Sequence, residues 1–247
     1  MYLTTRGLII RITKYSDTDA LLTVLTQNVG KITVKARGLY RKNSPLTASC
    51  QLLAFSEFTL FEYKEQYTSN EARTIELFRG LRKDLSKLSL GTYFAQVANV
   101  LSQEDISNPE LLSLTLNCLY ALDKIDVFEA LVKAVFELRA ACLSGYAPDL
   151  HGCSICMNPD PDRFSIFAGH LECSQCGDAS GGGVRMPISA GILDSMRYIC
   201  SCEPGKLFSF QVAENTAQSL SQITEAYLSA QLEQGFSTLD FYKSLQL

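Results

Sequence analysis

The stretch GKITVKARG, residues 30–38, decides the fold of the N-terminal part of the chain. Its apolar side chains point to one side of an extended backbone: Ile32, Val34 and Ala36. Its polar and charged side chains point to the other side: Lys31, Thr33, Lys35 and Arg37. This alternation predicts a strand that packs one face against a core and presents a cationic face to solvent.

Four more segments in the same region have strand character. They are TRGLIIRIT (5–13), ALLTVLT (20–26), FSEFTLFEY (55–63) and YTSNEARTIELF (67–78). Five short strands within residues 5–78 predict a small closed barrel, and the OB-fold is the commonest five-stranded candidate.

From Arg79 onward the period of the apolar residues becomes helical. Helical segments are predicted within residues 81–101, 107–122, 126–146, 187–201 and 213–233. Asn108 suits an N-cap, Pro109 suits the first helical position, and Gly145 suits a left-handed C-terminal cap. The segment 126–146 is predicted to bury one stripe of residues: Phe128, Leu131, Val132, Val135, Phe136 and Cys142.

Charge is distributed unevenly along the chain. The formal net charge is only −4. Residues 1–50 nevertheless hold eight basic and two acidic residues, a local net charge of +6, whereas residues 88–247 hold eight basic and eighteen acidic residues. A basic head on an acidic body indicates a phosphate-binding surface in the head.

The N-terminus enters a strand directly, without an apolar targeting segment, and no apolar run approaches the roughly 18 residues of a membrane span. A cytoplasmic protein without membrane contact is therefore predicted. Thiols stay reduced in the cytoplasm, so Cys-x-x-Cys pairs indicate metal or redox chemistry there rather than structural disulfides.

Two Cys-x-x-Cys pairs lie sixteen residues apart, and they comprise Cys153, Cys156, Cys173 and Cys176. This spacing is typical of a structural four-cysteine zinc site, in which each pair closes a tight knuckle and the loop brings both knuckles to one tetrahedral ion. One Zn²⁺ is predicted, and its full thiolate shell leaves no position for a reactive water. The two histidines of the chain, His151 and His170, lie beside these cysteines, and either is an alternative ligand, but exposed loop positions are expected for both.

The chain is therefore predicted to be an α+β multidomain protein. Its N-terminal OB-fold barrel occupies residues 1–79, its α-helical domain residues 80–150 and 184–247, and its inserted zinc module residues 151–183. The glycine-rich stretch 179–184 lacks the lysine and the preceding strand of a nucleotide-binding loop, so a hinge or turn is expected there.

Catalysis has little support in the sequence. Carboxylates are scattered, and the remaining cysteines are expected to be core or half-buried residues: Cys50, Cys118, Cys142, Cys200 and Cys202. No catalytic residue is predicted. A zinc-dependent or thiol-redox enzyme centred on residues 153–176 remains an alternative, which an open metal position or a reversible disulfide would reveal.

The segment KITVKARGLYRK, residues 31–42, is the best functional candidate. Cations track phosphates, and an aromatic ring such as that of Tyr40 can stack on an unpaired base. A solvated strand face is the alternative explanation. A second basic run, Arg79, Arg82, Lys83 and Lys87, either extends the same surface or solvates the outside of the first helix.

Several short motifs, in their order and spacing, resemble the RecO family of bacterial recombinational repair proteins. They are GLIIR (7–11) with Tyr15, Asp17, Asp19, Leu22 and Gly30, then FRGLRKDL (78–85), FELR (136–139), GYAP (145–148) and Cys153. The resemblance runs nearly from end to end and is weakest over residues 239–247.

The resemblance implies a non-catalytic mediator with an OB-fold and a helical domain that carries a zinc module. Proteins of this family bind single- and double-stranded DNA, anneal complementary strands and contact the acidic C-terminal tail of single-stranded-DNA-binding protein. With RecR, and in some pathways RecF, they help load RecA, so a cytoplasmic, nucleoid-associated protein is implied. Some members lack the zinc cysteines, which suggests that the metal is not the working part.

Together, the basic segment and the resemblance predict one set of DNA-binding residues: Arg11, Lys14, Lys31, Lys35, Arg37, Tyr40, Arg41 and Lys42. The alternative is a zinc-stapled scaffold that binds proteins without contacting DNA directly. A gel shift with oligonucleotides at low salt separates the two.

Overall fold

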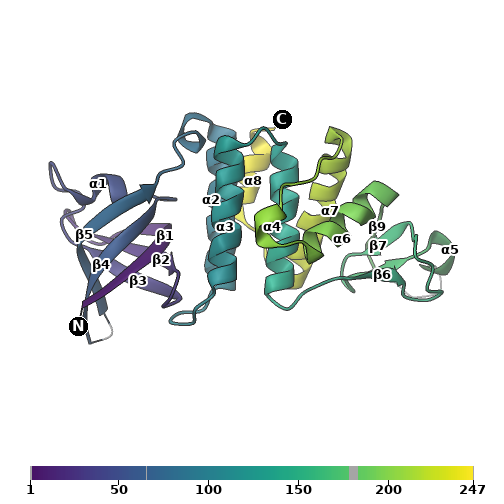
Figure 1. Cartoon of the computed structure of the whole chain (residues 1–247), viewed down its shortest axis with the longest axis horizontal. Coiled ribbons are helices and arrows are strands. Elements are labelled where there is room, and N and C mark those ends of the chain that lie inside the picture. Colours follow the sequence, from purple (N-terminus) through teal and green to yellow (C-terminus); the bar gives the residue numbers. More distant parts are fainter. Residues whose placement is uncertain (1, 65, 178–182, 247) are drawn as a thin grey trace. The chain divides into compact units, whose positions relative to one another are not determined.

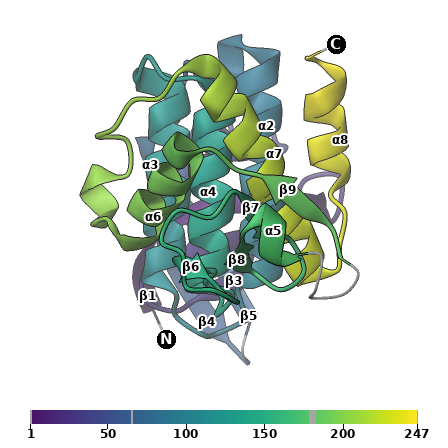
Figure 2. The same cartoon turned by 90° about the vertical axis from the view of Figure 1, so that its right-hand side faces the viewer.

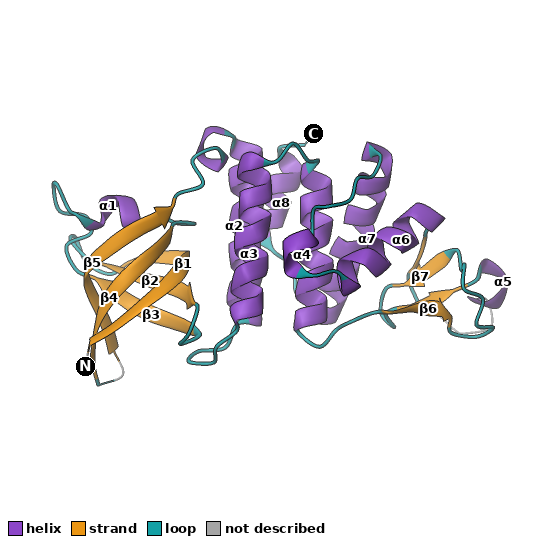
Figure 3. Cartoon of the chain, in the orientation of Figure 1, coloured by secondary structure: helices purple, strands orange, loops and turns teal. Residues whose placement is uncertain are grey.

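The computed structural model of the chain describes residues 2–64, 66–177 and 183–246, apart from the side chains of residues 70 and 177. The hinge or turn expected at 179–184 lies largely outside these residues. Nine strands are described: β1 Tyr2–Lys14, β2 Ala20–Thr26, β3 Lys31–Ala36, β4 Phe55–Tyr63, β5 Gln66–Glu76, β6 Asp149–Cys153, β7 Arg163–Ser165, β8 His170–Glu172 and β9 Arg185–Pro187. The helices described are α1 Leu46–Ser49, α2 Leu85–Leu101, α3 Pro109–Lys124, α4 Glu129–Leu143, α5 Ser174–Gly177, α6 Ala190–Ser201, α7 Glu214–Leu232 and α8 Ser237–Ser244 (Figures 1 and 3).

The first five strands form a closed barrel in the order β1-β2-β3-β5-β4. β1 is long enough to pair with β2 through its second half and with β4 through its first half. A parallel pairing of β3 with β5 closes the barrel. This architecture confirms the five-stranded barrel and OB-fold class predicted from the alternating segments.

The barrel core is apolar and follows the predicted alternation. In β3 the burial of successive residues alternates as expected, with Ile32, Val34 and Ala36 at most 3% exposed. β1 departs from strict alternation because its pairing with β2 shifts between Ile9 and Arg11, and both Ile9 and Ile10 are buried. Such a bulge bends the strand and lets it serve two neighbours in a small barrel.

Three helices complete the unit that contains the barrel. The helix expected from Leu81 is interrupted at Asp84, whose extended backbone and side-chain bond from the Lys87 N–H make it the N-cap of α2. α3 begins as predicted: Asn108 accepts a hydrogen bond from the Leu111 N–H, and Pro109 is the first helical residue. α8, which the sequence did not predict, packs on α2. Phe236 precedes α8, and its ring centroid lies 5.5 Å from that of Tyr93 on α2.

Helices α4, α6 and α7 belong to a second unit (Figure 2). α4 begins one residue after Phe128, which is 44% exposed, so the prediction that Phe128 belongs to the buried stripe is wrong. Gly145 follows the end of α4 with φ +88°, the left-handed conformation predicted for it. Where α4 meets α7, the buried ammonium of Lys133 lies 3.0 Å from Glu137 and 2.8 Å from Glu225.

Between α4 and α6 the chain forms a four-stranded sheet in the order β6-β8-β7-β9, which the sequence did not predict. These strands, together with α5, carry both cysteine pairs, and they are called the cysteine module here (residues 149–177 and 183–187). Its small core includes Phe164 and Leu171, both fully buried.

Contacts divide the chain into two compact units, residues 1–125 with 236–247 and residues 126–235. The proposed boundaries at residues 79, 151 and 183 concern smaller modules and stay a prediction. No helix in the described part of the chain combines the length and apolar character needed to cross a membrane.

Candidate nucleic-acid interface and metal centre

The outer face of the barrel carries part of the predicted cationic surface. Strand register places Lys35 opposite Leu21 of β2 and Thr68 of β5, on the side away from the core. The ammonium of Lys35 lies 4.4 Å from the ring centroid of Tyr15, which is 58% exposed. An ammonium beside an exposed ring combines two groups suited to single-stranded nucleic acid. The ammonium can bind phosphate, and the ring can stack on a base.

The loop after β3, residues 37–45, is held in place by Asp19 and is called the cationic loop here. One carboxylate oxygen of Asp19 accepts a 2.9 Å hydrogen bond from the Gly38 N–H, and the other lies 3.4 Å from the Lys35 ammonium. The bond from Gly38 holds the pKa of Asp19 below its usual value. The backbone N–H of Tyr40 also donates to the Thr18 carbonyl, so the β1–β2 turn and this loop form one structure.

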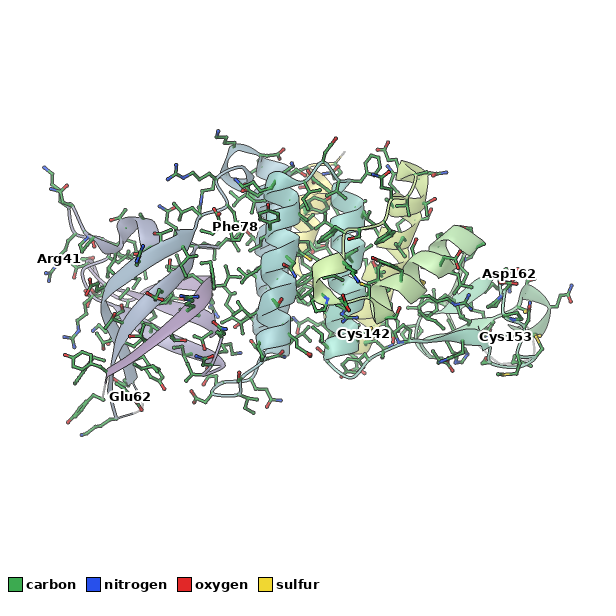
Figure 4. All side chains as sticks on the ribbon, viewed as in Figure 1. Arg41, Glu62, Phe78, Cys142, Cys153 and Asp162 are labelled. Atoms are coloured by element: carbon green, nitrogen blue, oxygen red, sulfur yellow. The ribbon has the colours of Figure 1, made fainter. Side chains whose placement is uncertain are left out.

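Four predicted contacts lie exposed on the cationic loop: Arg37, Tyr40, Arg41 and Lys42. The side chain of Arg41, labelled in Figure 4, lies close to Gly38, where an added Cβ would be 3.2 Å from its Cδ, and Lys42 and the half-exposed ring of Tyr40 are its neighbours in sequence. Gly38 with φ +69° and Asn43 with φ +61° make the tight turns of the loop. Backbone bonds from the Arg41 N–H to Gly38 and from the Ser44 N–H to Arg41 give the loop a defined shape.

The remaining predicted contacts are not all brought together. Lys31 lies at the opposite end of β3 from Arg37, and its ammonium donates to the Asn99 carbonyl at 2.9 Å. It therefore serves to join the barrel to α2. Lys14 lies 3.5 Å from the exposed carboxylate of Asp17, and Arg11 is exposed on β1.

In the second basic run, residues 79–87, Arg82 makes structural hydrogen bonds. Arg82 donates to the carbonyls of Leu52 and Leu77 at 2.7 and 3.2 Å. Burial lowers its pKa, although the group remains charged at any ordinary pH. These bonds tie the chain leaving the barrel to the loop before β4, so Arg82 is not a free cation.

One part of the outer face could not be predicted from the sequence. Tyr2 and Phe61 are paired residues on β1 and β4, 75% and 42% exposed, with ring centroids 5.4 Å apart. Together with Arg37 they line a hollow of about 360 Å³. The aromatic residues could be seen in the sequence, but only the β1–β4 register brings them together.

The four predicted metal ligands form one cluster. The Sγ atoms of Cys153, Cys156, Cys173 and Cys176 all lie within 4.8 Å of one another. Cys153 ends β6 and Cys176 lies on α5, while Asn158 donates to the sulfur of Cys173 at 3.2 Å. Four convergent thiolates suit a tetrahedral soft cation.

Local backbone geometry shapes the first knuckle. The Cys153 N–H donates to the Asn158 carbonyl and the Met157 N–H donates to the Cys153 carbonyl, while Met157 adopts φ +60°. A Cβ on Gly152 would lie 2.9 Å from the Asn158 oxygen, so glycine is required there for space. Gly177 ends α5 after the second pair.

The electrostatics of the cluster favour a cation. Burial opposes ionisation of Cys153, but N–H groups of Cys156, Ile155 and Cys173 outweigh it and lower the pKa to about 6. Hydrogen bonding with Cys156 and burial raise the pKa of Cys176 to about 12. Repulsion between a Cys176 thiolate and the neighbouring sulfurs of Cys156 and Cys153 acts in the same direction. A bound divalent cation reverses this repulsion and stabilises all four thiolates.

The two histidines lie in strands, so the expectation of loop positions is wrong. His151 is on β6, 2.9 Å from Asp149, and His170 is on β8, 2.9 Å from Glu172. Neither belongs to the cluster of four cysteines. Glu172 is nearly buried, and bonds from His170 and Arg185 outweigh its burial and lower its pKa.

The other five cysteines divide as expected into core and half-buried residues. Cys50 and Cys118 are buried, and burial raises the pKa of both thiols. Cys142, Cys200 and Cys202 are half-buried. The sulfurs of Cys142 on α4 and Cys200 on α6 lie 3.5 Å apart, a proximity that the sequence spacing does not reveal.

Comparisons with known proteins agree over nearly the whole chain. The family model "Recombination protein O N terminal" matches residues 1–78, and "Recombination protein O C terminal" matches residues 82–240. The chain is 35% identical over 246 residues to "DNA repair protein RecO" of Acetivibrio thermocellus, covering 99% of this chain and 97% of that protein. It is 28% identical to the proteins of the same name from Alkaliphilus metalliredigens and Symbiobacterium thermophilum, covering 99% and 97% of this chain and 100% and 96% of those proteins.

A closed five-stranded barrel followed by helices, together with these matches, defines a protein of the recombinational repair class. The chain belongs to the RecO family. This membership supports a role in DNA repair.

Proposed function

We propose that this protein is a non-catalytic, DNA-binding mediator of recombinational repair. The observation that carries the proposal is the cationic loop, whose exposed Arg41, Lys42 and Tyr40 continue the outer face of a closed OB-type barrel. OB-folds bind nucleic acids through the face of strands 2 and 3 and the adjoining loops. β3 and the turn at residues 15–19 correspond to that region in this chain.

Single- and double-stranded DNA are the proposed ligands, and strand annealing is the proposed activity. Cations that neutralise phosphates allow two negatively charged strands to approach each other, and binding energy alone supplies the driving force. Stacking on Tyr40 would keep bases unpaired until a complementary strand arrives. Arg37 and Arg41 are the contacts best supported by exposure, and Lys35 by its position over Tyr15.

The proposed partners follow from membership of the RecO family. "DNA repair protein RecO" of three bacteria is similar to this chain along its full length. We therefore extend to this chain the RecO-type partnership with RecR, RecF and the acidic tail of single-stranded-DNA-binding protein, leading to loading of RecA. We also propose that the protein acts at the bacterial nucleoid in the cytoplasm.

The proposed ion in the four-cysteine cluster is a single structural Zn²⁺. Four thiolates at one point form the donor set that zinc prefers, and they fill a tetrahedral shell. Zinc bound there would hold Cys153 and Cys156 against Cys173 and Cys176 and so fix the fold of the module. The proposal assigns the metal no part in DNA chemistry.

The salt dependence of oligonucleotide binding tests the DNA-binding proposal. Affinity for a labelled single strand should fall steeply with salt, with a slope that decreases by roughly 0.7 for each phosphate contact removed. The variant Lys35→Ala/Arg37→Ala/Arg41→Ala should therefore have a visibly shallower slope. Lys31→Ala is the matched control from the same strand face, since its ammonium is bonded to the Asn99 carbonyl.

Each possible result bears on the assignment. An unchanged slope in the triple variant would contradict these contacts, while a loss in Lys31→Ala alone would move the interface to the other end of β3. Absence of binding at low salt would favour the protein-binding scaffold instead.

A further inference from the structure

A hollow on the outside of the barrel combines aromatic, cationic and acidic side chains. It measures about 360 Å³, and its lining residues are Tyr2, Arg37, Thr59, Phe61, Thr68 and Glu71. Strand register explains the assembly: Phe61 pairs with both Tyr2 and Thr68, and Thr59 pairs with Glu71. The volume lies at the lower end of the range for small-ligand sites.

The aromatic pair in this hollow is arranged to receive a flat ligand. Tyr2 and Phe61 are 75% and 42% exposed, and their planes are inclined at 58°. At this inclination the rings do not cover each other's faces. An exposed aromatic pair beside a cation is the arrangement by which proteins stack and hold unpaired bases.

Two opposite charges line the same hollow. Among the described residues, no hydrogen bond or ion pair involves the guanidinium of Arg37 or the carboxylate of Glu71. An inorganic anion would gain from Arg37 but would be repelled by Glu71. A nucleotide satisfies both, because its phosphate is anionic while the edge of its base carries N–H donors.

We propose that this hollow binds one unpaired nucleotide of a DNA strand and selects its base. The base stacks on Tyr2 and Phe61, Arg37 holds the phosphate, and Glu71 accepts hydrogen bonds from N–H groups on the Watson–Crick edge. Guanine, cytosine and adenine carry an amino group on that edge. Thymine offers one N–H between two carbonyl oxygens, which repel a carboxylate.

The inference rests on the proposed DNA-binding function and adds two properties to it. A base in a duplex uses its Watson–Crick edge for pairing, so this hollow accepts only unpaired bases. Release of the base from Glu71 is then coupled to its pairing with a complementary strand.

Binding of two single strands that differ in base composition tests the proposal. Fluorescence anisotropy would compare labelled d(TC)8 with dT16 at one salt concentration and pH 7.5. A good base contact discriminates by roughly 1–3 kcal/mol, so d(TC)8 should bind at least about fivefold more tightly. The affinity tag belongs at the C-terminus, because Tyr2 lies beside the N-terminus.

Three variants separate the roles of the side chains. Glu71→Gln should bring the d(TC)8 to dT16 affinity ratio close to one, mainly by strengthening dT16 binding, because a neutral amide does not repel the thymine carbonyl oxygens and can donate to them. Tyr2→Ala and Phe61→Ala should weaken binding of both strands by about fivefold or more. Tyr120→Ala is the matched aromatic control, since this tyrosine is 51% exposed on α3.

The outcomes distinguish this inference from the proposed function. Equal affinity for both strands, unaltered by Glu71→Gln, Tyr2→Ala or Phe61→Ala, would overturn the base-binding hollow while DNA binding itself stands. Absence of binding to either strand at low salt would overturn both. Quenching of 2-aminopurine placed in the strand, lost in Tyr2→Ala and retained in Tyr120→Ala, would support stacking in the hollow; quenching that Tyr2→Ala and Phe61→Ala leave intact would contradict it.

Discussion

The barrel and the cysteine module are both small β structures, but different interactions stabilise them. The barrel encloses a continuous apolar cluster that includes Phe58, Leu22 and Val34. The cysteine module has three-residue strands, a few buried apolar side chains and four thiolates at one point. The four thiol groups, which are the most reactive side chains of the module, are therefore expected to stabilise its fold.

The interiors of the two compact units differ as well. The buried side chains described in the barrel are apolar or carry uncharged hydroxyl groups, and its charged side chains lie on the outer face. In the second unit the ammonium of Lys133, only 3% exposed, is enclosed by Glu137, Glu225 and the Ser221 carbonyl. A buried charge of this kind is stable only while all its partners remain.

Removal of one cysteine ligand should have the largest effect. Cys176→Ser leaves three thiolates, and because structural zinc contributes roughly 10–16 kcal/mol of binding free energy in zinc-finger peptides, the fold of the module should be lost with it. Metal analysis should show less than one ion per chain, and amide exchange should become fast in β6–β8 and stay slow in the barrel.

The half-buried Cys202, outside the cluster, provides the matched control. Cys202→Ser should retain the metal. Loss of oligonucleotide binding in a Cys176→Ser protein with an intact barrel would contradict the division between a binding barrel and a structural module.

A cavity in the barrel core should destabilise the barrel rather than the cysteine module. Phe58 is fully buried, and Phe58→Ala should destabilise the barrel by about 3–5 kcal/mol. Phe61→Ala, on the same strand but 42% exposed, should change stability far less. Exchange rates would be measured separately for β1–β5 and for α4 and α7; equal acceleration in both units would show that they unfold together.

The buried ion network of the second unit should be nearly as sensitive. Lys133→Ala leaves the fully buried carboxylate of Glu137 without its cation, at a cost of about 3–5 kcal/mol. Lys206→Ala removes an exposed pair with Glu203 and should change stability by at most about 1 kcal/mol. Chemical denaturation followed by a probe in α7 would measure both, and equal small changes would argue against a structural role for the network.

Local patterns determined what could be predicted from the sequence. Alternation over residues 30–38 predicted the strand and its two faces, and cysteine spacing predicted the cluster, because both signals depend on near neighbours. The parallel closure of β3 on β5 and the packing of α8 on α2 depend on pairings between distant segments. The eight-residue α8 also has too few turns to give a strong periodic signal.

The same distinction explains the site. Periodicity placed Lys31 and Lys35 on one face of β3, yet Lys31 meets the Asn99 carbonyl and Lys35 lies over Tyr15. No residue near Lys31 in the sequence indicates that Asn99, in the last turn of α2, lies beside it. The pairing of Tyr2 with Phe61 was hidden for the same reason, since it depends on the register of β1 with β4.

The smallest expected effect concerns Asp19, which fixes the cationic loop to the barrel. Asp19→Ala removes the acceptor for the Gly38 N–H and the partner of Lys35, so Gly38 amide exchange should accelerate and DNA affinity should fall modestly. Asp19→Asn keeps an acceptor oxygen and should preserve the loop.

Acid should weaken the Gly38–Asp19 bond in the wild-type protein, because a neutral carboxyl accepts a hydrogen bond less strongly than a carboxylate does. The pKa of Asp19 is lowered in the folded state, chiefly by the Gly38 bond, so its contribution to stability is fully present above the ordinary carboxyl pKa of 3.8 and is lost as the pH falls through the folded-state pKa. The Gly38 amide resonance should therefore titrate below pH 3.8 in the wild type and stay constant in Asp19→Asn. Titration of the Gly38 amide resonance near neutral pH would mean that a group other than Asp19 holds the cationic loop. The barrel would then depend on an additional polar contact, as the second unit depends on the contacts of Lys133.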